Sequence, residues 1–311
     1  SEIAPQTGLA LHTGKVPVTI SMSVVFFQVV AVVGATMFTW PREAQAVMLW
    51  FDIFNFDSSA AVNECSLSSY YAKYTLTCML PTAFMLVVIV VVVLVRMWRP
   101  VQIGHTVTRV VLVVGPIVYL ALSRTVLSIF DCTRRIDGVW ILDTDRRHKC
   151  YTARWWSFAR LGILYSLLYV AGIPFFCWLV VWRSRSVLYE PSAMKNIGGF
   201  YRSYRRHYYW FELMQMGRRL WVACASLFLS RRLSFQFLLL GGVFFASTLA
   251  FLGLEPYFLP MHNVLEARLN TILVVILVLG IMFNGNLFTP SQRVFFTVVI
   301  ILLLCAAVGL L

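Results

Sequence analysis

Residues 76–98, LTCMLPTAFMLVVIVVVVLVRMW, form an apolar run in which Arg96 is the only charged residue. A helix rises about 1.5 Å per residue, so about 20 residues are needed to cross the roughly 30 Å hydrocarbon core of a membrane. This run is long enough to do so. We therefore predict a transmembrane helix at this position.

The whole chain has the composition of a membrane protein. It is 60% hydrophobic over 311 residues and only 13% charged, whereas soluble domains carry about 25% charged residues. We expect an all-α fold, a polytopic transmembrane helix bundle over residues 16–311. The sequence predicts eight spans, at 16–40, 76–98, 107–130, 158–182, 212–229, 233–254, 264–283 and 292–311.

A shorter apolar stretch, AVMLWFDIFNF at 46–56, spans only about half a bilayer as a helix. Aromatic-rich helices of this length usually lie at the membrane interface, so we predict a short interfacial helix. A helix packed over the mouth of a pore is the alternative.

Basic residues in short loops tend to remain on the cytosolic side, which predicts the orientation. The connection between the second and third spans carries Arg96, Arg99 and Arg109 without an acid, and the linker 183–210 is also rich in arginine. Both are expected in the cytosol. Alternation then makes 1–15 a cytosolic N-terminal segment and places two loops outside, at 41–75 and 131–156.

The outer loops contain paired cysteines. Cys65 and Cys78 lie in or beside the first loop, and Cys132 and Cys150 bracket the second. Pairs of this kind favour disulfides in an oxidising compartment. We expect local pairing within each loop, although the sequence also permits crossed pairing, and His148 beside Cys150 is the sole hint of a zinc site.

Ionisable and amide side chains recur within the predicted spans. An unpaired charge in a span costs about 3 kcal/mol or more, so such residues should face protein or a wet cavity. We expect pairing of Glu212 or Arg219 with Arg268 or Glu266, either as a helix clamp or on an ion pathway. The predicted intramembrane polar face comprises Glu212, Gln215, Arg219, Asn263, Glu266 and Asn270.

The linker 183–210 combines basic and aromatic residues. Pro191, Gly198 and Gly199 interrupt helical patterning, and a short helix is expected within the linker. Aromatic rings with basic heads settle at headgroup depth and attract anionic lipid. We predict contacts with anionic inner-leaflet lipids, and no nucleic-acid partner, despite the net charge of +13. The predicted contact residues are Arg202, Arg205, Arg206 and Trp210.

Enzymatic function is not expected. Catalysis usually requires a nucleophile, a base and an orienting group close together. The five histidines are scattered over termini and loops, and none accompanies a nucleophile motif. We predict no cofactor and no metal site.

The order of motifs resembles the C-terminal membrane module of fungal and protist TRP-like (polycystin-like) proteins. The resemblance covers most of the chain, including FDCTRRIDGVWILDTDRRHKC and AGIPFF upstream. Glu255 departs from it, because a basic residue is common at this position. The matching residues are Gly199, Phe200 and Tyr201; Tyr209, Trp210 and Glu212; Arg218 and Arg219; Pro256 and Tyr257; Asn263 and Glu266.

The resemblance implies a channel-like or transport-related module of a larger surface protein in the plasma membrane, ciliary membrane or secretory pathway. The alternative is a non-conducting anchor for an extracellular assembly. Because the chain starts at Ser1 without a signal, we expect a fragment of a longer protein. Eight helices allow either a monomeric pathway or a homo-oligomer.

Overall fold

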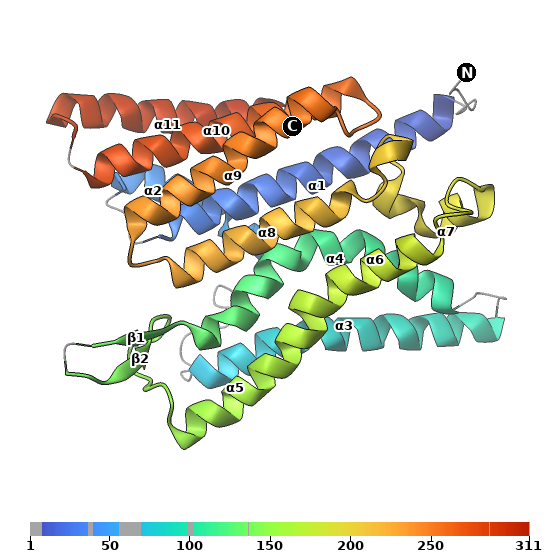
Figure 1. The fold of residues 1–311 in the computed structure, drawn as a ribbon, viewed down its shortest axis with the longest axis horizontal. Helices are drawn as coiled ribbons and strands as arrows, with labels where there is room; N and C mark the ends of the chain where they lie inside the picture. Colours follow the sequence, from blue (N-terminus) through green and yellow to red (C-terminus); the bar gives the residue numbers. More distant parts are fainter. Residues whose placement is uncertain are drawn as a thin grey trace. The chain divides into compact units, whose positions relative to one another are not determined.

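The computed structural model describes residues 8–36, 40–55, 70–98, 103–135, 137–285 and 287–310, with the backbone alone for residues 8–17, Trp98, Ile103 and Lys195. Its long elements are all helices, as expected (Figure 1). They divide into two compact units. The α4 unit comprises Asn55–Arg202 and Trp210–Phe228, and the α10 unit comprises Ser1–Phe54, Ser203–Tyr209 and Leu229–Leu311.

The α4 unit is organised around its central helix, which contacts α3, α5, α6, α7 and α8. A two-stranded antiparallel hairpin projects beyond these helices, with Cys132 opposite Leu142 (Figure 1). The elements are α3 (Tyr70–Trp98), α4 (Ile103–Leu127), a 3₁₀ turn (Ser128–Phe130), β1 (Cys132–Arg134), β2 (Trp140–Leu142), α5 (Ala153–Tyr165), a π-helix (Ser166–Ala171), α6 (Gly172–Arg183), α7 (Pro191–Tyr201) and α8 (Phe211–Phe228).

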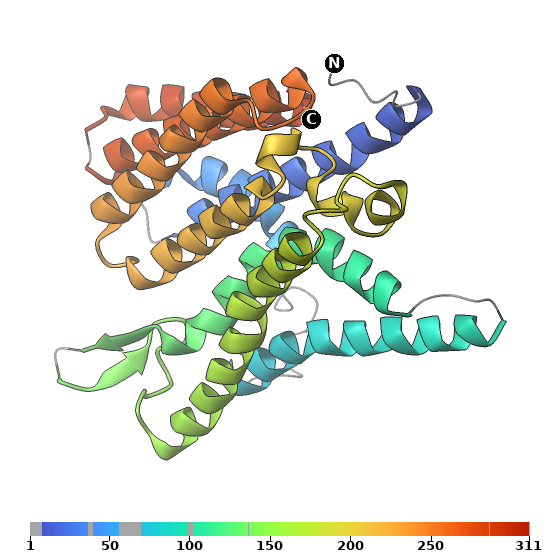
Figure 2. The same ribbon diagram turned by 45° about the vertical axis from the view of Figure 1, so that its right-hand side comes forward.

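The α10 unit consists mainly of α9, α10 and α11, which lie side by side in both views, together with α1 (Figures 1 and 2). Gly280 of α10 allows close packing, because a Cβ there would lie 2.7 Å from the Trp40 ring. The elements are α1 (Gly8–Gly34), α2 (Arg42–Trp50), a 3₁₀ helix (Phe51–Asn55), a 3₁₀ turn (Arg206–Tyr208), α9 (Leu233–Leu254), α10 (Pro260–Asn284) and α11 (Pro290–Leu310).

Six helical stretches within the described residues are long and apolar enough to cross a membrane, which supports a helical membrane bundle. They include α3, α4, α9, α10, α11 and the continuous stretch Ala153–Arg183. Eight spans are not confirmed. Helix α8 forms where a span was predicted but has only 18 residues and carries three charges, while the apolar part of α1, Val18–Gly34, is also short.

The predicted interfacial helix corresponds to α2 and the 3₁₀ helix that follows it. One side packs on α1, where the Phe27 ring stacks on that of Phe51 at 4.3 Å. Trp50 and Ile53 are 82% and 76% exposed. Exposed apolar side chains of this size are typical of a helix at a lipid interface.

The structure corrects one prediction in the linker. Gly198 and Gly199 do not interrupt helix there, because both lie within α7, whereas Pro191 is the first residue of α7 and marks a helix boundary. Pro191 occupies the first turn, where its missing N–H has no intrahelical acceptor. Gly199 faces α4, and a Cβ there would lie 2.8 Å from Val113, so close helix packing accounts for this glycine.

Proline distorts the continuous helical segment formed by α5, the π-helix and α6 (Figure 2). Pro174 has no N–H to offer the Val170 carbonyl four residues earlier. The hydroxyl of Tyr119 on α4 donates to that carbonyl at 2.7 Å. The helix is therefore irregular just before Pro174, where Ser166–Ala171 form a π-helix, a common cause of bends in helices.

Candidate intramembrane polar sites

Glu212, Gln215 and Arg219, the α8 residues of the predicted polar face, are mostly buried. Gln215 and Arg219 are each 5% exposed as residues, and the Glu212 side chain is 14% exposed. Arg219 Nη1 donates to Glu212 Oε1 at 3.0 Å, which forms an ion pair seven residues apart on one helix. The negative charge that the sequence places at the start of this helix is therefore matched by a positive charge two turns later.

Arg219 also joins α8 to α4. The same Nη1 atom donates to the carbonyl oxygen of Pro116 at 3.0 Å. A carbonyl oxygen has two lone pairs, so it accepts a side-chain donor beside any backbone bond. Two acceptors, a carboxylate and a backbone carbonyl, thus share one guanidinium.

A second polar face lies on α10, in the other unit. His262, Asn263, Glu266 and Asn270 are between 2% and 6% exposed. Their spacing places them on one side of the helix over its first turns. Further along the same helix the buried residues are apolar, Leu273, Ile276, Leu277, Leu279 and Phe283 among them.

Asn263 has a clear structural role. Its Oδ1 accepts from the Tyr257 N–H at 2.9 Å and its Nδ2 donates to the Tyr257 carbonyl at 3.0 Å. This amide therefore replaces the missing helical partners in the turn between α9 and α10. Tyr257 in turn stacks on Tyr204 at 4.7 Å, and the two residues form an isolated antiparallel bridge.

The predicted pairing between the two faces stays a prediction. Glu212 and Arg219 belong to the α4 unit, whereas Glu266 and Arg268 belong to the α10 unit. Arg268 is exposed, in contrast to the buried Glu266. The ion pair that the structure describes for Glu212 and Arg219 is the one between them, within the α4 unit.

The basic linker is largely at the surface. Arg205 and Arg206 are exposed, Trp210 is 40% exposed and Arg202 is half-buried. Arg205 donates to Glu255 at 2.6 Å, with both side chains more than 40% exposed. Glu255 thus neutralises Arg205, one of the four residues assigned to lipid contact.

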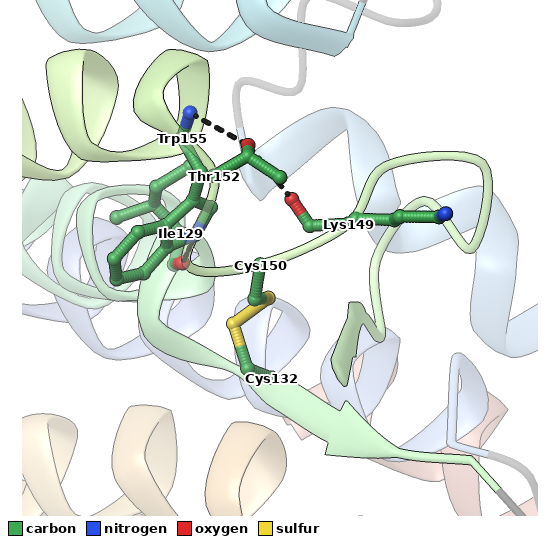
Figure 3. Close-up of a disulfide and its surroundings, with 6 residues drawn as sticks. All are labelled: Ile129, Cys132, Lys149, Cys150, Thr152 and Trp155. Carbon is green, nitrogen blue, oxygen red and sulfur yellow. Dashed lines mark hydrogen bonds between the residues drawn. A yellow bond between two sulfur atoms is a disulfide. The ribbon is translucent and has the colours of Figure 1, made fainter. Parts of the chain in front are cut away.

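The predicted disulfide between Cys132 and Cys150 is confirmed (Figure 3). It ties the start of β1 to the segment that precedes α5. Thr152 caps α5 by accepting from the Trp155 N–H at 3.2 Å, and the Trp155 ring N–H donates to the Ile129 carbonyl at 3.1 Å. The disulfide therefore joins β1 to the segment before α5, and the Trp155 hydrogen bond joins α5 to the 3₁₀ turn that follows α4.

The structure goes against the predicted bond between Cys65 and Cys78. Cys78 is a free, buried thiol inside α3, where its carbonyl accepts from the Tyr169 hydroxyl at 3.0 Å. The helix begins at Tyr70, so Cys78 lies two turns inside it and not in a loop. Cys65 itself lies outside the described residues.

Sequence reasoning missed two participants in these sites. The carbonyl of Pro116 accepts from Arg219, a contact that residue spacing does not reveal. The backbone of Tyr257, which the sequence marked only through the resemblance, holds Asn263. For Pro116, a proline within a span is a usable signal, because disturbed backbone groups in lipid require protein partners.

Among the described residues, no three His, Cys, Asp or Glu side chains come close enough together to hold a metal ion. The fold defines the chain as a polytopic helical membrane protein with a disulfide-bonded loop. Comparison with known protein families, curated proteins and solved structures gives no match.

Proposed function

We propose that this chain is the membrane module of a TRP-like (polycystin-like) surface protein, and that it conducts ions or moves lipid. The α10 face with Glu266 and Asn270 contributes to the pathway. This proposal extends the resemblance of the sequence, and it assigns the plasma membrane, ciliary membrane or secretory pathway as the location.

The observation that carries it is the burial of Glu266, which is 6% exposed in a helix long enough to span. Ionisable groups inside spans mark ion or substrate pathways by default, because placing them there is costly. Carboxylate and amide oxygens on one helix face also suit a cation. Glu212 serves as the comparison residue, because its ion pair with Arg219 is described.

Flux through purified protein in liposomes tests this proposal. Glu266→Gln should reduce cation flux or change its selectivity, while the melting temperature in detergent stays close to that of the unaltered protein. Glu212→Gln is the matched control, because it changes the same chemical group at a described ion pair. It should lower the melting temperature, and it should change the flux less than Glu266→Gln does. No flux above empty liposomes would overturn the proposal.

A non-conducting anchor is the second candidate. It is favoured by the bonds of Arg219 and Asn263, since both hold backbone carbonyls and act as helix clamps. In that case Glu266→Gln lowers the melting temperature and no flux exists to change. The exposed Arg206 and Trp210 remain proposed contacts for anionic lipid under either function, and assembly into a homo-oligomer or larger complex remains a proposal.

A further inference from the structure

Three aromatic side chains form a surface beside the disulfide. Trp140, Tyr151 and Trp156 are 40%, 51% and 50% exposed. The Tyr151 ring links the other two, with its centroid 5.7 Å from Trp140 and 6.5 Å from Trp156. The ring of the buried Trp155 supports Tyr151 from below at 5.0 Å. We refer to Trp140, Tyr151 and Trp156 as the aromatic surface.

The backbone places Tyr151 there at a cost. Its φ is 61°, in the left-handed region that a bulky residue rarely adopts. The neighbouring Cys150 is held on both sides, by its disulfide to Cys132 and by its N–H donating to the Trp140 carbonyl at 2.9 Å. Strained residues persist where the surroundings determine them, and they cluster at functional sites. The disulfide and hairpin thus fix the position of an exposed ring.

The aromatic surface continues the lipid-facing side of α5. Trp156, Ile163 and Leu167 lie on one helix face and are 50%, 46% and 64% exposed. They belong to the stretch Ala153–Arg183, which is long and apolar enough to span a membrane. An exposed apolar face on such a helix is covered by lipid. Trp156 lies at the beginning of that face, and Tyr151 and Trp140 extend it onto the hairpin.

We propose that the aromatic surface inserts among the lipid headgroups of the leaflet in which α5 begins. Tryptophan and tyrosine are enriched at this depth because their rings are apolar while the indole N–H and phenol O–H remain hydrogen-bonded. Arg160, exposed one turn after Trp156, offers a guanidinium to lipid phosphates. The hairpin therefore contacts the membrane surface in a position held by the disulfide, and this contact is distinct from that of the basic linker 183–210.

Fluorescence quenching in vesicles tests this. The full chain is reconstituted in phosphatidylcholine with or without acyl chains brominated near the headgroup, and the Trp140 signal is the difference between the protein and its Trp140→Phe variant. We expect brominated lipid to remove most of this signal and aqueous acrylamide to leave most of it. The Trp156 signal, obtained through Trp156→Phe, should behave in the same way.

Two tryptophans calibrate the measurement. Trp182, 48% exposed near the other end of the same stretch, should be quenched by brominated lipid. Trp155, 4% exposed, should respond weakly to both quenchers. If acrylamide quenches Trp140 and brominated lipid does not, the aromatic surface faces water and the proposal is overturned. A water-facing surface of this kind would suit a sugar chain or a protein.

The disulfide supplies a second measurement. In a Cys132→Ser/Cys150→Ser variant, Trp140 should lose its lipid quenching and gain quenching by acrylamide, while Trp182 is unchanged. Lipid quenching of Trp140 that survives in the double variant would show that the disulfide does not hold the ring at the membrane. That result would overturn the fastening part of the proposal.

Discussion

The hydroxyl of Tyr119 donates to the carbonyl of Val170 at 2.7 Å, and Val170 lies four residues before Pro174. In a regular helix the residue at 174 would donate to this carbonyl, but proline has no N–H. The phenol of α4 therefore supplies a donor where the helix lacks one. This contact fastens the irregular part of a long membrane helix to the central helix of its unit.

Tyr119→Phe should lower the free energy of unfolding by about 1–3 kcal/mol, the usual cost of leaving a buried polar group without its partner. The same substitution should cost less in a Pro174→Ala background, because the restored N–H can donate to Val170. Chemical unfolding in detergent of the two single variants and the double variant gives the coupling. Equal costs of Tyr119→Phe in both backgrounds would contradict this account.

Arg219→Leu removes the charge that satisfies both Glu212 and the Pro116 carbonyl. Truncating one partner of a buried ion pair costs about 3–5 kcal/mol, because the remaining charge is left uncompensated. We expect the free energy of unfolding to fall by this amount in Arg219→Leu. Part of the loss should be recovered in Arg219→Leu/Glu212→Gln. Arg218→Leu, at the more exposed neighbouring position, is the matched control. A control as damaging as Arg219→Leu would show that the ion pair is not the cause.

Composition and periodicity predicted the parts of the fold that depend on local chemistry. Helices form at the predicted positions, six of them among the described residues long and apolar enough to span, and Cys132 and Cys150 pair within their own loop, because helix formation and short loop closure are local properties. The polar face of α8 also follows from spacing alone.

The partners of those faces depend on packing and were not predictable. Spacing alone does not reveal that Arg219 has a carboxylate partner two turns earlier on the same helix, or that its second acceptor is a backbone atom. Gly199 was interpreted as a helix breaker, although it lies inside α7 against α4. Cys78 was assigned to a loop edge because the start of α3 at Tyr70 is polar in sequence.

The thiol count tests the corrected cysteine assignment. Of the seven cysteines, two form the disulfide found among the described residues and four more are described as free, so with Cys65 we expect five thiols. Maleimide labelling of denatured, unreduced protein followed by mass spectrometry should therefore add five labels. A count of three would restore the bond between Cys65 and Cys78. After reduction all seven should react, which checks that labelling is complete.

Asp145 gives the hairpin loop a defined response to acid. Hydrogen bonds from Arg147, through Nε at 3.0 Å and Nη2 at 3.2 Å, lower the pKa of Asp145 below its ordinary value of 3.8. A carboxyl group whose pKa is lower in the folded state stabilises that state above its unfolded pKa, and this contribution is lost as the pH falls through the folded value. The loop should therefore keep the contact at neutral pH and lose it only below pH 3.8.

Arg147→Gln should raise the pKa of Asp145 toward its ordinary value, because the main cause of the shift is removed. Carboxyl NMR of ¹³C-aspartate-labelled protein in micelles measures this, with Asp145→Asn identifying the resonance. Since the Arg147 side chain is 81% exposed, salt should weaken the shift in the unaltered protein. Arg146→Gln changes the neighbouring arginine, which makes no hydrogen bond among the causes of the shift, and should leave the pKa nearly unchanged. A pKa equally lowered in Arg147→Gln would assign the shift to the weaker influence of His148, whose Nε2 lies 3.7 Å from the carboxylate.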